Sequence, residues 1–184
     1  MTANHIGFYG RSGTGKSHLM KQIAKSLAAY KQKMIIYGPV GDDGWPADAQ
    51  RYRCPKEFDR ALQRPENWGA YIFIDEAKRL YNTNNLKEVP FMLSDGRHKG
   101  FTVMIAAQRP YYIPPDDRAN LNKVYCFRLQ TKYDRRHVGE DFGEIYVNRL
   151  PLEEAINQLD LYEYFRLENH PGGKSSGVKG GGVR

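Results

Sequence analysis

A glycine-rich stretch near the N-terminus constrains the fold more than any other feature of this sequence. Residues 10–17 read GRSGTGKS and satisfy the pattern G-x-x-x-x-G-K-[ST] in full. They lie between an apolar run, residues 5–9, and residues 16–30, where apolar side chains recur at helical spacing. Glycines allow close approach of the backbone, so successive N–H groups can surround an anion, and the following helix adds its dipole. The stretch therefore predicts a phosphate-binding loop between a strand and a helix.

The phosphate-binding loop predicts separate roles for its residues. Lys16 is expected to reach the β- and γ-phosphates of a nucleotide, and the hydroxyl of Ser17 is expected to bind Mg²⁺. Residues 122–125, NKVY, lack the Asp of the guanine-binding pattern N-K-x-D, which favours ATP over GTP. Eight residues are predicted to bind the nucleotide: Gly10, Arg11, Ser12, Gly13, Thr14, Gly15, Lys16 and Ser17.

Two adjacent carboxylates follow an apolar run further along the chain. Residues 71–74 read YIFI, which is typical of a buried strand, and Asp75 and Glu76 come directly after them. At the end of such a strand, Asp75 can hold Mg²⁺ opposite Ser17. Glu76 can polarise an attacking water as a general base. Together with a complete phosphate-binding loop, this pair predicts hydrolysis of ATP.

A polar side chain ends another apolar run. Gln108 closes the sequence FTVMIAAQ, residues 101–108, which is predicted to form a strand. A side-chain amide both donates and accepts hydrogen bonds. At a strand end beside the attacking water and the γ-phosphate, it can respond to whether that phosphate is present. Gln108 is therefore a candidate sensor.

Strand-sized apolar runs alternate with amphipathic segments along most of the chain. Strands are predicted over residues 5–9, 34–37, 70–77, 101–108 and 123–130, with a closing edge strand over residues 161–169. Helices are predicted over residues 16–30, 55–63, 89–94 and 152–159. This alternation predicts an α/β fold in which helices cover both faces of a mostly parallel sheet.

Length and composition favour one compact domain followed by a short tail. A chain of 184 residues with 40% hydrophobic residues is typical of a single globular domain, which we assign to residues 1–169. Residues 170–184 are rich in Gly, Ser and Lys and cannot bury enough apolar surface to order themselves, so they predict a flexible tail. No apolar run has the length of a membrane-spanning helix, so no transmembrane segment is expected.

The distribution of charge favours a polyanionic partner. The formal net charge is +7, and six Lys and Arg residues precede the first acidic residue, Asp42. Between Arg97 and Arg136, nine Lys and Arg residues stand against three Asp. Such a basic stretch is typical of proteins that bind nucleic acid.

Three short segments follow one another in a characteristic order. They read DEA at residues 75–77, DGRHKG at residues 95–100 and QRP at residues 108–110. This order resembles the FtsK–HerA superfamily of DNA-pumping ATPases, which have a RecA-like (ASCE) P-loop NTPase fold. In that superfamily a strand ends in Asp-Glu-Ala, an acidic-Gly-Arg-basic-x-Gly turn follows, and the next strand ends in Gln-Arg-Pro. The resemblance spans residues 7–136.

The resemblance implies a ring of subunits, expected to be a hexamer, with ATP between neighbours and double-stranded DNA in the pore. It implies that Lys16, Glu76 and Gln108 act in catalysis. Arg97 matches the position of an arginine finger, which reaches the γ-phosphate bound by the neighbouring subunit. Three other arginines are alternatives for this role: Arg109, Arg118 and Arg135.

Among members of the superfamily, this chain looks most like the genome-packaging ATPases of membrane-containing icosahedral viruses, because it lacks the added domains of the larger translocases. That likeness implies a motor that moves double-stranded DNA without regard to sequence. It also implies a place in the cytoplasm of the host cell or on the virion, and a capsid vertex or portal protein as a further partner.

Other functions fit parts of the same pattern. A filamentous-phage assembly ATPase of the Zot-like group has the same nucleotide motifs, but it typically continues into a membrane helix. A binding module could use the nucleotide only as a switch, against which the complete Asp75–Glu76 pair argues. A small-molecule kinase would transfer the phosphate to an acceptor other than water. Turnover measured with and without duplex DNA separates these functions from a DNA pump.

Overall fold

The computed structural model describes residues 4–38, 43–143, 145–147, 149–169 and 175–181. For Arg97 and Asn169 the structure describes the backbone but not the side chain. The chain forms two compact units, of which unit 1 consists of Met1–His5 and Ser17–Ala106, and unit 2 of Ile6–Lys16 and Ala107–Arg184. Within the described residues, no helix is long and apolar enough to span a membrane.

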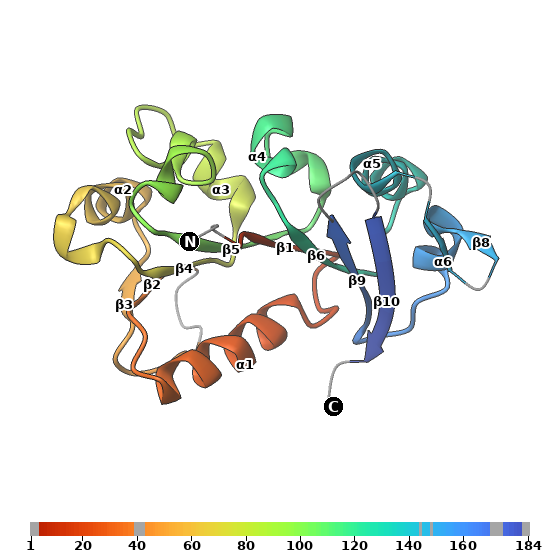
Figure 1. Cartoon of the computed structure of the whole chain (residues 1–184), viewed down its shortest axis with the longest axis horizontal. Coiled ribbons are helices and arrows are strands. Elements are labelled where there is room, and N and C mark those ends of the chain that lie inside the picture. The colour runs from red at the N-terminus through yellow and green to blue at the C-terminus, as the bar shows by residue number, and fades with distance from the viewer. Residues whose placement is uncertain (1–3, 39–42, 144, 148, 170–174, 182–184) are drawn as a thin grey trace. The chain divides into compact units, whose positions relative to one another are not determined.

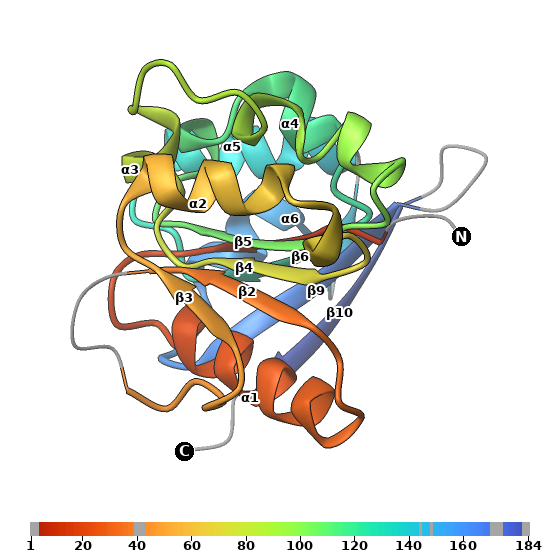
Figure 2. The same ribbon diagram turned by 90° about the vertical axis from the view of Figure 1, so that its left-hand side faces the viewer.

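Unit 1 contains four parallel strands in the order β3-β2-β4-β5. Their bounds are β2 Met34–Tyr37, β3 Gln50–Tyr52, β4 Tyr71–Ile74 and β5 Thr102–Ala107. Helix α1 (Lys16–Ala29) covers one face of this sheet, and α2 (Pro55–Gln63) and α3 (Ala77–Tyr81) cover the other (Figures 1 and 2). Strands β2, β4 and β5 are almost continuously apolar because both of their faces are buried. The predicted α/β fold with a mostly parallel sheet is confirmed.

Helix α2 has the bounds that its sequence predicts. Pro55 stands at its first turn, where the missing N–H of proline costs no hydrogen bond. Glu57 lies in the first turn and Arg60 in the last, which suits the helix dipole. The apolar side chains of Phe58 and Leu62 are fully buried. Local sequence and burial therefore agree along this helix.

One buried carboxylate on α2 holds a distant loop in place. Asp59 is 4% exposed, and its Oδ1 accepts hydrogen bonds from the backbone N–H groups of Lys87, Glu88 and Val89 at 3.0, 2.8 and 3.0 Å. Lys99 forms an ion pair with Glu88 across the same loop. These contacts fix the start of the segment that leads to residues 95–100.

Asp59→Ala is expected to destabilise unit 1 strongly. Three backbone N–H groups, of which that of Val89 is buried, would lose their acceptor together, so the free energy of unfolding should fall by about 3 kcal/mol. Chemical denaturation followed by circular dichroism measures this change. Asp48→Ala removes an exposed carboxylate from the same unit and should leave the denaturant concentration at the midpoint of unfolding unchanged. Equal midpoints for Asp59→Ala and the wild type would refute the role of Asp59.

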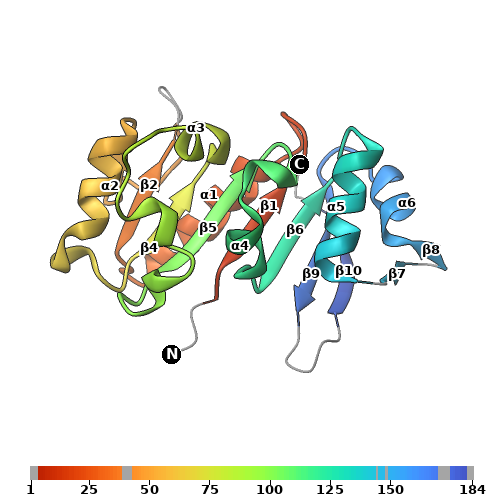
Figure 3. The ribbon, with the colours of Figure 1, turned by 90° about the horizontal axis from the view of Figure 1, so that it is seen from above.

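Unit 2 contains four strands in the order β10-β9-β6-β1. Strand β1 (Ile6–Tyr9) pairs in parallel with β6 (Lys123–Phe127), and β9 (Glu163–Asn169) pairs antiparallel with both β6 and β10 (Ser175–Gly181). The remaining elements of unit 2 are α4 Pro115–Ala119, α5 Lys132–Phe142, β7 Tyr146–Val147, β8 Leu150–Pro151 and α6 Leu152–Asn157. Helices α5 and α6 lie side by side, and α5 also contacts β9 (Figure 3).

The helix predicted over residues 89–94 is wrong in type. The structure has two 3₁₀ turns, η2 (Val89–Phe91) and η3 (Asp95–Arg97). Their backbone bonds run from residue i+3 to residue i: Met92 N–H donates to the Val89 carbonyl, and His98 N–H donates to the Asp95 carbonyl. The second turn begins so soon after the first that no α-helical turn fits between them. Two further 3₁₀ turns are η1 (Pro65–Asn67) and η4 (Pro110–Tyr112).

The C-terminal segment also differs from its prediction. β9 lies inside the sheet of unit 2 and is not its edge, because β10 pairs with it from Ser175 to Gly181. These residues belong to the segment that composition alone predicts to be a flexible tail. Backbone pairing needs few apolar side chains, and the ring of Tyr164 packs against Gly180, where a Cβ would lie only 2.6 Å from it. Residues 170–174 and 182–184 lie outside the described residues, and the boundary at residue 169 stays a prediction.

Candidate nucleotide-binding site

The phosphate-binding loop follows β1 directly and is fixed by backbone hydrogen bonds within unit 2. The N–H of Gly10 donates to the carbonyl of Ala107 at 3.2 Å, and the N–H of Arg11 donates to the carbonyl of Arg128 at 3.3 Å. The Thr14 hydroxyl donates to the Arg11 carbonyl at 2.9 Å. These hydrogen bonds give the loop a defined shape.

Two glycines of this loop adopt backbone conformations that other residues rarely reach. Gly13 has φ +78° and Gly15 has φ +104°. A Cβ at Gly15 would lie 2.9 Å from the ring of Tyr162, whereas a Cβ at Gly13 would meet nothing within 4 Å. The open space at Gly13 lets an oxyanion approach the backbone closely. The loop thus fits the phosphates of a nucleotide.

Lys16 lies over this loop. Its ammonium group donates to the carbonyl of Arg11 at 2.8 Å, and the residue is 8% exposed. A buried ammonium group at a loop that precedes a helix N-terminus adds positive charge where the helix dipole already favours anions. The role of Lys16 in phosphate binding stays a prediction.

The next residue, Ser17, contacts the first of the two predicted carboxylates within unit 1. The hydroxyl of Ser17 donates to Oδ1 of Asp75 at 2.6 Å. Asp75 follows β4 directly, and its N–H donates to the carbonyl of Tyr37 at 2.9 Å. Adjacent hydroxyl and carboxylate oxygens are the ligands that Mg²⁺ prefers, with waters and phosphate oxygens completing its shell. These two residues therefore fit a Mg²⁺ ion. Within the described residues there is no cluster of three or more His, Cys, Asp or Glu able to hold a metal.

Glu76 occupies the N-cap position of α3, yet its carboxylate makes no capping hydrogen bond. The residue is exposed. Its charge reaches the buried phenol of Tyr37: burial raises the pKa of Tyr37, Arg79 lowers it, and Glu76 raises it further. A carboxylate that is neither capping a helix nor buried can accept a proton from water. The general-base role of Glu76 stays a prediction.

Gln108 lies beside the phosphate-binding loop in unit 2. It follows β5, is exposed, and lines a cavity of about 550 Å³. Arg11 and Ser12 of the loop line the same cavity, together with Arg109, Gln130, Thr131 and Asp134. The structure therefore brings the candidate sensor next to predicted nucleotide-binding residues, as the sequence pattern implied, while its sensing role stays a prediction.

The candidate arginine finger, Arg97, is the last residue of η3. The backbone around it is fixed, because the N–H of Phe101 donates to the carbonyl of Gly96 at 3.0 Å. The direction of its side chain lies outside the described residues. The side chains of the three alternative arginines all form hydrogen bonds with other residues of unit 2. Arg109 bonds Asp134, Arg118 bonds Asp141 and the carbonyl of Ile113, and Arg135 bonds the carbonyl of Leu129.

Sequence reasoning missed α5 and the buried carboxylate at its start. Thr131 is the N-cap of α5, and its hydroxyl oxygen accepts the N–H of Asp134 at 3.0 Å. The same hydroxyl donates to Oδ2 of Asp134 at 2.7 Å. The spacing [ST]-x-x-[DE] at residues 131–134 is a signal for such a helix start. It could have located both α5 and Asp134.

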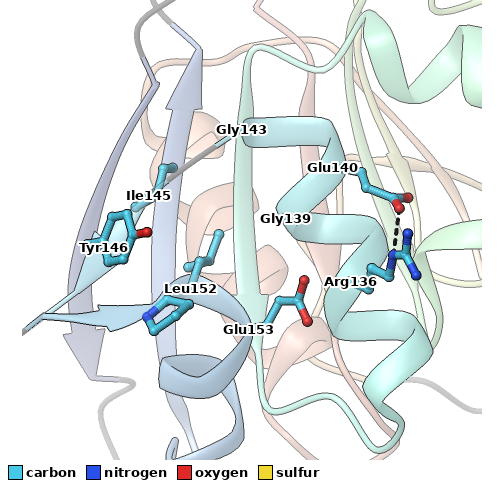
Figure 4. A pocket seen from close by; sticks show the side chains of 9 residues that line it. Arg136, Gly139, Glu140, Gly143, Ile145, Tyr146, Leu152 and Glu153 are labelled. Carbon is cyan, nitrogen blue, oxygen red and sulfur yellow. Dashed lines mark hydrogen bonds and ion pairs between the residues drawn. The ribbon is translucent and has the colours of Figure 1, made fainter.

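A second hollow of about 350 Å³ lies between α5, α6 and the β7–β8 hairpin (Figure 4). Arg136 and Glu140 form an ion pair one helical turn apart on its α5 side, at 2.9 Å. Both side chains are more than half exposed, so the pair contributes little to stability. None of the residues that the sequence predicts to act in catalysis or to bind nucleotide or metal lines this hollow.

About half of the chain, including the phosphate-binding loop, matches a known protein family. The model of the family described as RNA helicase matches residues 6–99, which include the phosphate-binding loop and both carboxylates. The chain belongs to this RNA helicase family. A viral relative, uncharacterized protein L437 of Acanthamoeba polyphaga mimivirus, is 22% identical over 88 residues. That match covers 48% of this chain and 31% of the length of L437.

Solved structures place this RNA helicase family member among P-loop NTPases in fold. The genome-packaging NTPase B204 of Sulfolobus turreted icosahedral virus 2, in complex with AMPPCP, superposes with a TM-score of 0.74 and 16% identity. The superposition covers 96% of this chain and 97% of B204. The N-terminal domain of zonular occludens toxin from Neisseria meningitidis superposes with a TM-score of 0.57 and 15% identity, over 97% and 94% of the two chains. The resemblance to viral packaging ATPases of the FtsK–HerA type is thus confirmed for the fold.

Proposed function

We propose that this protein is an ATP hydrolase that moves double-stranded DNA, and that it acts as a viral genome-packaging motor. The observation that carries the proposal is the Ser17–Asp75 contact, at the residue that directly follows a shaped phosphate-binding loop in the sequence. The fold shared with a packaging NTPase that was solved with an ATP analogue supports it. The similar solved structures support nucleotide binding by this fold. The movement of DNA is our own proposal and goes beyond what those structures support.

Each residue of the proposed site has one task. Lys16 and the loop N–H groups hold the β- and γ-phosphates, and Ser17 and Asp75 hold Mg²⁺. When bound, Mg²⁺ supplies positive charge that offsets the charge developing on the phosphate oxygens. Glu76 takes the proton from the attacking water, and Gln108 senses whether the γ-phosphate is present.

Glu76→Gln is expected to bind ATP and Mg²⁺ normally and to hydrolyse ATP about 10²–10⁴ times more slowly, because the amide cannot accept the proton. Steady-state phosphate release measures the rate, and equilibrium binding of an ATP analogue measures the affinity. Glu57→Gln makes the same change at an exposed position on α2 and should keep both values. Wild-type turnover by a clean preparation of Glu76→Gln would exclude the general-base assignment.

Duplex DNA is the proposed cargo. The net charge of +7 and the basic stretch from Arg97 to Arg136 support a polyanion, and a pump must accept every base pair without regard to sequence. We infer a homo-oligomeric ring, expected to be a hexamer, that works in the host cytoplasm or on the virion. A capsid vertex or portal protein would be its further partner.

ATP turnover with and without nucleic acid tests the proposed function. Duplex DNA of arbitrary sequence should stimulate turnover several-fold, and the stimulation should weaken as salt rises. Because the family description names an RNA helicase, duplex and single-stranded RNA are the necessary second arm. Stimulation by RNA alone would replace DNA by RNA as the cargo. Turnover that neither nucleic acid stimulates would favour an assembly ATPase, and the absence of turnover would favour a nucleotide switch.

A second candidate is a filamentous-phage assembly ATPase of the Zot-like group. It is favoured by the shared fold with the N-terminal domain of zonular occludens toxin. Such a protein should hydrolyse ATP at a rate that duplex DNA does not change. The same turnover assay therefore separates the two functions.

A further inference from the structure

The guanidinium group of Arg109 is held in a fixed position at the wall of the cavity that Gln108 lines. Its Nε donates to both carboxylate oxygens of Asp134, at 2.9 and 3.2 Å. The guanidinium carbon lies 4.4 Å from the centre of the Tyr111 ring, within the range of a cation–π contact. The hydrogen bond to Asp134 raises the pKa of Arg109, so the group is charged at every relevant pH.

Both bonds to Asp134 use the same nitrogen, Nε. Within the part of the chain that the structure describes, neither terminal nitrogen of Arg109 donates a hydrogen bond. The Arg109 side chain is 34% exposed, whereas that of Asp134 is 2% exposed. A guanidinium group normally presents its two-nitrogen fork to a carboxylate or a phosphate. Here the fork is left available, and the cavity lined by Arg109 is where an acceptor can reach it.

The walls of this cavity favour an anion. Arg11 and Arg109 are cations, and Ser12, Gln108 and Gln130 supply further donors. The carboxylate among the lining residues, Asp134, already accepts from Arg109 and from the Thr131 hydroxyl. A group with several acceptor oxygens therefore suits the space better than a cation or an apolar group.

We propose that Arg109 donates to the terminal phosphate of a nucleoside triphosphate held by the phosphate-binding loop of the same chain. This inference rests on the proposed nucleotide site, because Arg11 and Ser12 belong to both the loop and the cavity wall. Arg109 thus makes the site distinguish a triphosphate from a diphosphate. Asp134 and Tyr111 are positioning residues that fix the guanidinium group before the nucleotide arrives.

Equilibrium binding of AMPPCP and ADP, measured by calorimetry without hydrolysis, tests this inference. Wild-type protein should bind AMPPCP more tightly than ADP. Arg109→Ala should weaken AMPPCP about 10- to 100-fold, the range expected for a lost charge-assisted hydrogen bond, and should leave ADP within about two-fold. Arg136→Ala removes an equal charge from an exposed ion pair in the same unit and should change neither value.

Further variants keep the test valid if Arg109→Ala does not fold. Arg109→Lys keeps a cation opposite Asp134 but loses the planar fork, so it should also lose most of the preference for AMPPCP. Tyr111→Leu removes the ring contact with Arg109, together with the ring contacts to Tyr112 and Tyr133, and should reduce that preference partially. An unchanged ratio of AMPPCP to ADP affinity in a folded Arg109 variant would overturn the inference.

The phosphate could instead come from the nucleic-acid backbone, and a separate arm distinguishes this source. Duplex DNA binding is measured without nucleotide. If Arg109→Ala weakened DNA binding and left the AMPPCP-to-ADP ratio intact, the assignment to nucleotide would be overturned. If the wild type bound neither AMPPCP nor ADP, the proposed nucleotide site itself would fail as well. A clear wild-type preference that Arg109→Ala does not alter removes this inference alone.

Discussion

Lys16→Ala should lower the affinity for ATP about 10³-fold or abolish binding altogether. The buried ammonium group of Lys16 lies at the phosphate-binding loop and is expected to pair with the β- and γ-phosphates, and loss of one partner of a desolvated charge pair costs several kcal/mol. The loop should keep its shape, because the Thr14 hydroxyl also donates to the carbonyl that Lys16 contacts. Calorimetric titration with Mg-ATP measures the affinity.

Lys21→Ala is the matched control for this variant. Lys21 lies on the same helix, and its ammonium group contacts the Asp43 carbonyl near the ring of Trp45. The Lys21→Ala variant should bind ATP with the affinity of the wild type. Wild-type affinity in Lys16→Ala, with the loop shown to be folded, would mean that the nucleotide binds elsewhere.

Arg97→Ala should bind ATP almost normally but lose about 10³- to 10⁵-fold in turnover, the range that an arginine finger supplies. If Arg97 acts on the neighbouring subunit, its charge matters only in the assembled protein, when negative charge develops in the transition state. Arg60→Ala removes an equal charge from the exposed face of α2 and should keep full turnover.

Mixing variants tests whether the site is shared between subunits. Arg97→Ala and Lys16→Ala subunits should each be inactive, but if the site is shared, a mixed assembly would contain some interfaces that pair an intact Lys16 site with an intact Arg97. Activity should therefore reappear on mixing. No recovery at any ratio, with assembly confirmed by sedimentation, would mean that Arg97 acts within its own subunit or not at all.

The parts of the site that depend on local sequence were predictable. The positive φ of Gly13 and Gly15 follows from a known loop pattern, and an apolar run ending in Asp75 places that carboxylate at a strand end. The contact between Ser17 and Asp75 joins residues far apart in the chain. It could still be expected, because a phosphate-binding loop and the neighbouring strand end share one Mg²⁺ in proteins with both motifs.

The parts that depend on long-range contacts were not predictable from periodicity. Strand β10 has almost no apolar residues, and it pairs because β9 offers a free strand edge and Tyr164 covers Gly180. Asp59 accepts hydrogen bonds from backbone N–H groups of a loop about thirty residues away in the chain. No local sequence pattern predicts this contact. Helix α5 carries few buried apolar side chains, so only its capping residues mark it.

ATP-driven displacement of a third strand from duplex DNA tests the central claim most directly. A short oligonucleotide is bound as a triplex at one end of a duplex, and its release is followed by fluorescence after ATP is added. The wild-type protein should release the strand only with ATP and Mg²⁺, and release should fail with AMPPCP or with Glu76→Gln. Hydrolysis of ATP on that DNA without any release of the third strand would contradict translocation.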